Sequence, residues 1–446
     1  MEITIPSQVT TVIQKLKESG QEAYVVGGCV RDSIMGLSPH DWDVTTSARP
    51  NEVKAALNGF KLIETGLKHG TLTVLIDRMP IEVTTYRVDG QYSDNRHPDE
   101  VRFTRNLKED LARRDFTINA LAYNYVDGLV DCFGGIEDIQ NKKIRCVGEP
   151  DHRFCEDALR ILRALRFSSV LGFTIEEETA RSILRNYPLL DSIARERVQT
   201  EFTKLLCGKN AEEVLRDYHM VIGQFLPEIN TMVGFEQHNR YHIYDVWEHT
   251  LKSVSFIEAS PVLRMTMLLH DIGKPLCFTQ DEKGVGHFYG HDKKSTETAK
   301  AVLQRLKYDG DTINQIVTLV QYHDIALPAE EKLLRRRLSL LGEENLRLLF
   351  EVKAADMMAQ NPIYRDRLTD LKKAEAVLND IIAKKLCWSL KNLEINGADL
   401  IELGVPQGAE IGRMLSSLLE DVIEDKCPNR HWALMNRARL MKDHKL

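Results

Sequence analysis

The sequence lacks a basic excess. Its 446 residues carry 59 Lys and Arg against 66 Asp and Glu, a formal net charge of −7. This balance argues against non-specific binding of nucleic acid along a basic surface. A nucleic-acid substrate would require a local positive track, for which Arg335-Arg336-Arg337 and the segment 429–446 are candidates, although charge runs are more commonly solvated faces.

Paired cysteines and long apolar runs are also missing. The eight cysteines are scattered with no Cys-x-x-Cys pair, so neither a disulfide framework nor a thiolate zinc site is indicated. No apolar run approaches the ~20 residues that span a bilayer, and the first residues have no signal-peptide pattern. We therefore expect a cytoplasmic protein with no membrane partner. The composition leaves the oligomeric state open.

The length and the hydrophobic pattern predict several units of an α+β protein. A chain of 446 residues is expected to form two to four units with cores. Up to about residue 145, β-rich apolar runs alternate with helical patterns, which predicts a small α/β domain. From Pro150 onward strand signals nearly vanish. Apolar residues then recur at helical spacing in the segments 158–170, 176–184, 195–206, 246–257, 261–269, 296–306 and 346–358.

A glycine turn near the start of the chain is typical of phosphate binding. The run Val25-Val26-Gly27-Gly28 is read as a strand followed by a turn that opens a helix. Gly27 and Gly28 would let the backbone approach phosphate oxygens at the helix start, where unpaired N–H groups favour negative charge. Arg31 adds a cationic side chain beside them. Alone, a Gly-Gly pair is more commonly only a turn.

A pair of carboxylates follows the glycine turn. On a strand, a spacing of two places Asp41 and Asp43 on one face, while Trp42 and Val44 face a core. Adjacent carboxylates repel unless a cation lies between them, so they suit a pair of divalent ions, most simply Mg²⁺. Glu82 could be a third acid, although spacing alone favours an exposed strand glutamate. Together with the glycines, the pair favours nucleotidyl transfer.

Three motifs in order resemble one enzyme family. The opening Gly-Gly-x-Val-Arg-Asp, the block 113–123 and the block 156–167 resemble the class II tRNA nucleotidyltransferases and their bacterial poly(A) polymerase relatives. The resemblance runs from about residue 22 to 198 and resumes near 397–400. It implies a nucleotidyltransferase head at 1–145, a helical neck at 146–225 and a tRNA-binding tail at 376–446. It further implies that the protein builds or repairs the 3′ CCA end of tRNA with CTP and ATP.

Asp157 and Arg160 are candidates for base selection. Being three apart in a predicted helix, they would lie on one face. One acceptor beside one donor matches cytosine and adenine and mismatches uracil and guanine, at about 1–3 kcal/mol for each unpaired buried group. A surface ion pair is the simpler interpretation, but the resemblance implies that this pair is the family's amino-acid template. The other nucleotide-binding candidates are Arg114, Asp115, Asn119, Arg163 and Arg166.

Two further features of the first half carry predictions. Asp115 and Asn119 are four apart on a helix expected after Arg113-Arg114, where they could contact ribose, although an Asp at a helix start is equally explained as an N-cap. The polar segment 89–98, with Gly90 and Pro98, predicts a mobile loop. It matches the flexible loop of the family.

Histidines and aspartates recur through the middle of the chain. An adjacent His-Asp pair at a helix end, with more of both on neighbouring helices, can converge on one or two divalent ions. The series resembles the HD phosphohydrolase superfamily, which implies a metal-dependent hydrolase domain at 226–375. Its metal could be Mg²⁺, Mn²⁺, Ni²⁺, Co²⁺ or Fe. The resemblance implies four ligands, His249, His270, Asp271 and Asp356, and two extra positions of two-metal members, His291 and His323.

The sequence thus predicts a two-activity enzyme, with alternatives. Adding CCA to tRNA is the main prediction, with hydrolysis of a phosphodiester or phosphate by the HD domain as the second activity. A poly(A) polymerase or an A-adding enzyme would take ATP alone. A nucleotide-signalling HD regulator is the alternative of another class, disfavoured by the blocks at 113–123 and 156–167.

Overall fold

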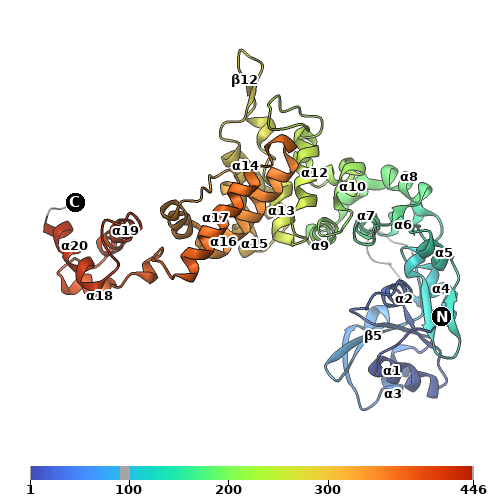
Figure 1. Ribbon diagram of the computed structural model, residues 1–446. Helices are drawn as coiled ribbons and strands as arrows, with labels where there is room; N and C mark the ends of the chain where they lie inside the picture. The colour runs from blue at the N-terminus through green and yellow to red at the C-terminus, as the bar shows by residue number, and fades with distance from the viewer. Residues whose placement is uncertain (1, 91–100, 444–446) are drawn as a thin grey trace. The chain divides into compact units, whose positions relative to one another are not determined.

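The computed structural model describes residues 2–90 and 101–443. The chain divides into two compact units, Met1–Pro227 and Glu228–Leu446. Strands dominate the beginning of the first unit and helices the rest of the chain (Figure 1). This order of elements confirms the expected α+β organisation, in which a mixed head is followed by helices. The four segment boundaries remain predictions, and residues 91–98 of the predicted loop lie outside the described residues.

A seven-stranded sheet with the order β3-β4-β5-β2-β1-β8-β9 is the framework of the head. Only β2 and β5 pair in parallel within it, whereas the other neighbouring strands are antiparallel. All four residues of β1 are buried, which fits its nearly central position in the sheet. The strands of the sheet are β1 (Ala23–Val26), β2 (Asp43–Thr46), β3 (Lys61–Gly66), β4 (Thr71–Ile76), β5 (Met79–Thr85), β8 (Leu121–Asn124) and β9 (Gly128–Asp131).

Short helices and small strand pairs complete the head. The strand pairs are β6 (Arg87–Asp89) with β7 (Val101–Phe103), and β10 (Lys143–Ile144) with β11 (Thr174–Ile175). The helices are α1 (Ser7–Glu18), α2 (Gly28–Ile34), α3 (Pro50–Ala56), α4 (Leu107–Ala112) and α5 (Gly135–Gln140), with a 3-10 turn η2 (Thr117–Asn119).

Helices fill the remainder of the first unit. Helix α7 is the most buried of them, with ten of its thirteen residues inaccessible, and it packs against α9. Two boundaries, those of α9 and α13, agree fully with the predicted segments. The helices here are α6 (Pro150–Glu156), α7 (Leu159–Leu171), α8 (Glu177–Asn186), α9 (Arg195–Leu206), α10 (Ala211–Asp217) and α11 (His219–Gly223).

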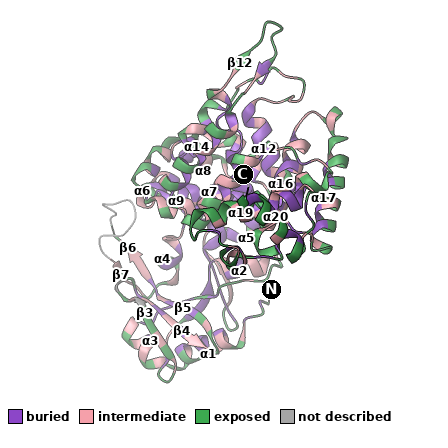
Figure 2. Cartoon of the chain, turned by 90° about the vertical axis from the view of Figure 1, so that its left-hand side faces the viewer, coloured by how far each residue is buried: buried purple, intermediate pink, exposed green. Residues whose placement is uncertain are grey.

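The second unit begins with a helical bundle. Helix α12 packs on α13 and α16, and α14 packs on α15. Helix α16 contains a break at Gly342, whose φ of 76° is non-helical. Helix α17 alternates buried and exposed residues, as a helix lying on one side of a bundle does (Figure 2). The bundle comprises α12 (Val246–Phe256), α13 (Pro261–Leu269), α14 (His291–Arg305), α15 (Gly310–Tyr322), α16 (Glu331–Ala359) and α17 (Arg367–Ala383), with a hairpin of β12 (Thr279–Gln280) and β13 (Gly286–His287).

The last helices share a small core of their own. Leu400, Leu418 and Leu434 are fully buried in a cluster that spans residues 387–441. The helices are α18 (Gly397–Glu402), α19 (Ala409–Ile423) and α20 (His431–Asp443). Among the described residues, no helix combines the length and the apolar character needed to cross a lipid bilayer.

Candidate active sites

Three acids meet at one end of the parallel strand pair in the head. Asp43 begins β2 and lies in register with Glu82 of β5, and Asp41 lies two residues before Asp43. The alternating residues Trp42 and Val44 are buried, as the alternation predicts. Desolvation by the surrounding protein and the charges of Glu82 and Asp41 raise the pKa of Asp43 from 3.8 to about 6. The acids therefore repel one another and form a site for cations.

Gly27 and Arg114 border these acids. Gly27 has a φ of 83°, and a Cβ built on it would lie 3.0 Å from Arg114 Nη1. Both the backbone conformation and the space therefore favour glycine here. Burial lowers the pKa of Arg114, opposed by the charges of Asp110 and Asp43. The Arg114 guanidinium thus lies within electrostatic reach of the acid cluster, while Gly28 begins α2 as predicted.

Three predicted arginines surround one aromatic ring. The guanidinium carbons of Arg31, Arg163 and Arg166 lie 5.1, 5.5 and 4.0 Å from the centroid of the Phe167 ring. Such distances permit cation–π attraction. Phe167 was not among the predicted site residues, because an aromatic residue at helical spacing is usually only part of the core. The ring gathers the positive charge that a triphosphate would need.

Each of these arginines also has an internal acidic or polar partner. Arg31 Nη1 donates to Asn119 Oδ1 at 2.6 Å, and Arg163 Nη2 donates to Asp115 Oδ2 at 2.6 Å. The Arg166 Nε lies 2.8 Å from Glu201 Oε2, a residue that the sequence analysis missed. These contacts fix the arginines before any ligand arrives.

The prediction that Asp115 and Asn119 share an α-helix is wrong. Residues Thr117–Asn119 form one 3-10 turn, and Asp115 precedes it. The two side chains still meet, because Asn119 Nδ2 donates to Asp115 Oδ1 at 3.1 Å. Burial opposes ionisation of Asp115, but Arg163 and Asn119 outweigh it and hold its pKa below the usual range. Asp115 is therefore an ionised anchor for Arg163.

The prediction that Asp157 and Arg160 lie on one helix face is also wrong. Helix α6 ends at Glu156, Asp157 is extended with φ −140° and ψ 101°, and α7 begins at Leu159. Asp157 Oδ1 instead accepts a hydrogen bond from the Leu159 N–H at 3.1 Å. Its Oδ2 accepts from Arg197 Nη2 at 2.9 Å. Asp157 is thus positioned by α9 and by the start of α7.

Arg160 has partners of its own. Its Nη1 donates to Glu156 Oε2 at 2.6 Å, and its Nη2 donates to the Arg113 carbonyl at 3.1 Å. The side chain is 8% exposed. Arg160 and Asp157 are therefore held separately, and Arg197, forty residues from Asp157, is a positioning residue that no local spacing could indicate.

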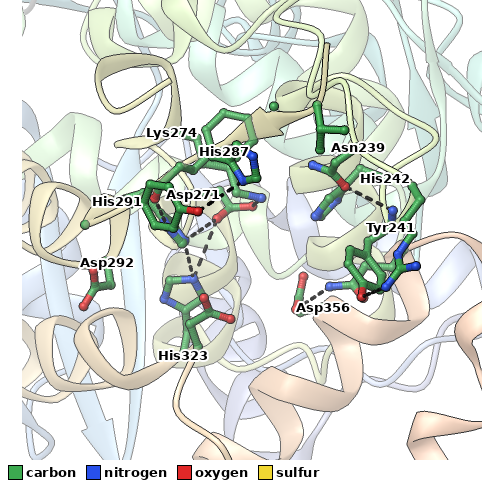
Figure 3. A pocket seen from close by; sticks show the side chains of 18 residues that line it. Asn239, Tyr241, His242, Asp271, Lys274, His287, His291, Asp292, His323 and Asp356 are labelled. Carbon is green, nitrogen blue, oxygen red and sulfur yellow. Dashed lines mark hydrogen bonds and ion pairs between the residues drawn. The ribbon is translucent and has the colours of Figure 1, made fainter. Parts of the chain in front are cut away.

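A second site lies in the helical bundle of the second unit. All six predicted ligands converge there, although they come from α12, α14, α16 and the ends of α13 and α15. Figure 3 shows four of them, Asp271, His291, His323 and Asp356. Their ligand atoms form two groups. His249 and His270 approach one side of Asp271, with Asp356 Oδ1 3.0 Å from His249 Nε2, whereas His291 and His323 approach its other side.

Asp271 links the two groups through different oxygens. Its Oδ2 lies 3.4 Å from His249 Nε2 and 3.2 Å from His270 Nε2. Its Oδ1 lies 3.5 Å from His291 Nε2 and 3.7 Å from His323 Nε2. The carboxylate is buried, yet His270 and Lys274 hold its pKa well below the usual range. A carboxylate with one oxygen toward each group is arranged to bridge two cations.

Backbone carbonyls orient three of the imidazoles. The Nδ1 atoms of His270, His291 and His323 lie 2.7, 2.9 and 2.7 Å from the carbonyl oxygens three residues earlier in the chain. Because a carbonyl oxygen only accepts hydrogen bonds, each Nδ1 carries a proton and each Nε2 of a neutral ring offers a lone pair to the cluster. This is the arrangement that metal-ligating histidines use.

The cluster passes a test for metal binding. His291 Nε2 and His323 Nε2 are 3.2 Å apart, and two lone pairs at that distance repel unless a proton or a cation lies between them. Within the described residues, the buried Nε2 atoms of His249 and His270 make no hydrogen bond and face carboxylate oxygens instead. Unpaired buried polar atoms are costly. Mixed nitrogen and oxygen donors around the site therefore fit one or two divalent ions.

A cavity of about 670 Å³ opens beside this cluster. Lys274 lines it, with its Nζ 2.7 Å from Asp271 Oδ2 and within hydrogen-bond distance, 2.9 Å, of Gln237 Oε1. The sequence analysis named neither residue, although Lys274 follows the His-Asp pair by three positions. A buried lysine at the edge of the cavity can bind an anionic ligand.

The candidate positive track at 335–337 is not a free basic surface. Arg335 is 4% exposed and donates from Nε to the Cys387 carbonyl at 2.8 Å. Arg336 forms ion pairs with Glu420 and Glu424. These two arginines stabilise the junction with residues 387–424, and RNA binding at 335–337 and at 429–446 stays a prediction.

Comparison with protein families matches three parts of the chain. Residues 23–145 match the poly A polymerase head domain, 172–232 match a probable RNA and SrmB-binding site of polymerase A, and 281–438 match a putative tRNA nucleotidyltransferase domain 2. A CCA-adding enzyme of Bacillus velezensis is 34% identical over 420 residues, which cover 94% of each chain. The chain belongs to the class II CCA-adding enzyme and poly(A) polymerase family.

Two further relatives define the extent of the similarity. A CCA-adding enzyme of Lactobacillus delbrueckii subsp. bulgaricus is 48% identical over 212 residues, so the chain spans about half the length of that curated relative (53%). The crystal structure of Bacillus stearothermophilus CCA-adding enzyme in complex with CTP matches with a TM-score of 0.74 and 28% identity, over 99% of both chains. The family membership thus extends over the whole chain, with its highest identity confined to about half.

Proposed function

We propose that this protein adds or repairs the 3′-terminal CCA of tRNA with CTP and ATP and without a nucleic-acid template. The observation that best supports this function is the cluster of three acids, Asp41, Asp43 and Glu82, beside Gly27 and Arg114. Mg²⁺ held by Asp41 and Asp43 would activate the attacking hydroxyl and neutralise charge on the leaving group. The names of the family relatives support the same substrate class.

The chemistry assigns distinct tasks to the residues of the head. The 3′ hydroxyl oxygen of the RNA forms a bond to the α-phosphorus, the bond from that phosphorus to the bridging oxygen breaks, and pyrophosphate leaves. The arginines around Phe167 would hold the triphosphate in line for this attack. Asp43 or Glu82, which lie side by side, would accept the hydroxyl proton.

Base selection is assigned to Asp157 and Arg160. A carboxylate oxygen has two lone pairs, so Asp157 Oδ2 can accept from an exocyclic amine while Arg197 holds it. Arg160 would donate to the adjacent ring nitrogen. This pair favours C and A over U and G for the hydrogen-bonding reason given above, and it needs no nucleic-acid template.

The test uses end-labelled tRNA that lacks CCA, incubated with each nucleotide separately and with CTP and ATP together. Two additions from CTP alone, followed by one from ATP, are expected. Use of ATP alone would identify a poly(A) polymerase or an A-adding enzyme instead. In a parallel reaction with labelled UTP, label on a protein with the tRNA unchanged would favour the signalling alternative.

A second activity, metal-dependent hydrolysis of a phosphoester, is proposed for the bundle. The specific observation is the six-residue cluster with Asp271 between its two halves. Divalent ions bound there would supply a hydroxide nucleophile at neutral pH. In hydrolysis of a 2′,3′-cyclic phosphate, a water oxygen bonds to phosphorus, one phosphorus–ribose oxygen bond breaks, and that oxygen takes a proton. The product phosphate, once removed, would leave the hydroxyl that the head needs.

This activity is tested by metal analysis of the purified protein and by hydrolysis of a 2′,3′-cyclic phosphate with Mg²⁺, Mn²⁺, Ni²⁺, Co²⁺ and Fe²⁺. We expect bound metal and turnover with at least one ion. A metal-free protein that is inactive with every ion would restrict the function to nucleotide addition.

A further inference from the structure

Two aromatic rings line the cavity beside the six-residue cluster, His287 at the end of the β12–β13 hairpin and Tyr289 two residues later. The ring centroids of His287 and Tyr289 are 5.3 Å apart and their planes differ by 8°, so the rings stack. His287 Nε2 lies 3.3 Å from Asp281 Oδ2, and the Tyr289 hydroxyl lies 3.4 Å from His287 Nδ1. Contacts on both sides of the imidazole thus set the orientation of the pair.

Tyr289 has much more open ring surface than its partner. It is 78% exposed, whereas the His287 side chain is 32% exposed. Single exposed aromatic residues are common, but this one is stacked, oriented and located at a cavity. An open aromatic face of this kind is the surface on which nucleobases stack.

The pair is close to the cluster along the chain. Tyr289 precedes His291 by two residues, so their Cα atoms lie within about 7 Å. His287, Lys274 and His291 all border the cavity in Figure 3. Lys274 and Arg240 line the same cavity, but so do Asp271, Asp292, Asp324 and Asp356. A phosphate attached to a stacked base would therefore need the cations proposed for the cluster as well as these two side chains.

The opposite wall of the cavity is less suitable for stacking. Tyr241 also lines it, but the Arg240 guanidinium carbon lies 4.8 Å from its ring centroid and the Tyr364 ring lies 4.8 Å away. These neighbours already occupy much of the ring surface. The hairpin pair therefore offers the more accessible aromatic face.

We infer that Tyr289, supported by His287, is a nucleobase-binding subsite of the bundle site. Its ligand is a ribonucleotide whose phosphoester reaches the six-residue cluster, either free or at the 3′ end of an RNA. This inference rests on the proposed hydrolysis, and it adds that the base, as well as the phosphate, is recognised.

The kinetic test compares substrates with and without a base. For wild type and Tyr289→Ala, kcat/KM is measured on ribose 2′,3′-cyclic phosphate, on adenosine 2′,3′-cyclic phosphate and on an oligoribonucleotide that ends in a 2′,3′-cyclic phosphate. The ratio of either base-containing substrate to the abasic one should fall about 5- to 150-fold, as for the loss of one stacked base. Tyr289→Phe, which keeps the ring, should restore the ratio.

Leu276→Ala is the matched control, because Leu276 is 60% exposed near the hairpin and does not line the cavity. It should leave the ratio unchanged. If the kcat/KM ratio falls in Tyr289→Ala for the oligonucleotide alone, the ligand is an RNA end. If it falls for the oligonucleotide and for adenosine 2′,3′-cyclic phosphate, the ligand is any nucleotide. An unchanged ratio in Tyr289→Ala, with active wild type, would overturn the subsite.

A binding measurement separates this inference from the proposed hydrolysis. In EDTA, titration calorimetry compares 3′-AMP and inorganic phosphate on wild type and Tyr289→Ala. Binding of 3′-AMP in the head is common to both proteins, so the difference between them reports on the subsite. Weaker 3′-AMP binding with equal phosphate binding supports it even if no hydrolysis is found, and equal 3′-AMP binding overturns it.

Discussion

The two candidate sites offer opposite kinds of ligand to a cation. In the head, Asp41, Asp43 and Glu82 are solvent-accessible carboxylates that offer only oxygen ligands. In the bundle, His249, His270 and Asp271 are fully buried and nitrogen dominates. Oxygen donors with open coordination suit Mg²⁺ that arrives with a nucleotide, whereas a buried nitrogen-rich site suits a resident transition metal. The comparison teaches that one chain can present an open, oxygen-only ligand set and a buried, nitrogen-rich one, which suit different cations.

The largest expected effect is on the exposed site. Asp43→Ala should lower nucleotide addition by about a thousandfold or more, because metal charge stabilisation in the transition state is worth several kcal/mol. Incorporation of labelled CTP into tRNA lacking CCA measures it. Glu18→Ala removes an exposed carboxylate elsewhere in the head and should have no effect. Near-wild-type turnover of Asp43→Ala would remove the acids from the mechanism.

The shared carboxylate of the buried site gives the next effect. Asp271→Ala should lose both metal equivalents, whereas His291→Ala should lose only one, because Asp271 faces both halves of the cluster. We expect affinity losses beyond the 10- to 100-fold typical of outer hydrogen-bond partners. Metal content by mass spectrometry after dialysis is the measurement.

Asp311→Ala, which removes an exposed carboxylate at the start of α15, is the control for metal content. CCA addition should remain near normal in all three variants. Equal metal loss in Asp271→Ala and His291→Ala would contradict a shared ligand.

Base selection should respond less strongly. Arg160→Ala should reduce discrimination of CTP and ATP against UTP and GTP by roughly 1–3 kcal/mol. Arg197→Ala keeps the Asp157 carboxylate but removes the hydrogen bond that orients it. We therefore expect a smaller loss of discrimination than in Arg160→Ala, with a higher KM for CTP. Arg197→Lys should recover part of it. If Arg160→Ala uses the four nucleotides in the same proportions as wild type, this arginine is structural.

The smallest effect concerns pH. Asp43 has a pKa of about 6 in the folded protein against 3.8 ordinarily, so between these values the folded state keeps a proton that the unfolded chain releases. This contribution stabilises the metal-free protein at low pH and is lost as the pH rises through 6. We therefore expect the Tm of wild type minus the Tm of Asp43→Asn, both measured in EDTA, to decrease as the pH rises from 4 to 7. A constant difference would mean that neither desolvation nor the neighbouring carboxylates raise the pKa of Asp43.

Local spacing predicted what short segments determine. The alternation around Trp42 located the acids, because it depends on a few consecutive residues. The six residues of the bundle do lie together, but only the family resemblance, and no spacing, grouped them in advance. The helix boundaries of α9 and α13 followed from periodicity alone.

The errors arose where distant residues decide the local conformation. Asp157 was expected on the helix of Arg160, yet the chain leaves the helix there, where the carboxylate accepts hydrogen bonds from the Leu159 N–H two residues on and from Arg197. Arg335 was a candidate for surface charge, but it donates to carbonyls of residues 387 and 422 in the interior. Arg197 lies 40 residues from Asp157, and the two carbonyls lie 52 and 87 residues from Arg335, so no pattern of nearby residues encodes these partners.

The arginines around Phe167 have a consequence for turnover. Arg163 and Arg166 are already paired with Asp115 and Glu201, so a triphosphate exchanges one set of counter-ions for another. Such an exchange gains less free energy than neutralising bare charges would. If the proposed reaction takes place there, the same carboxylates would pair with the guanidinium groups again when pyrophosphate leaves. The internal ion pairs would therefore favour product release and rapid cycling over tight nucleotide binding.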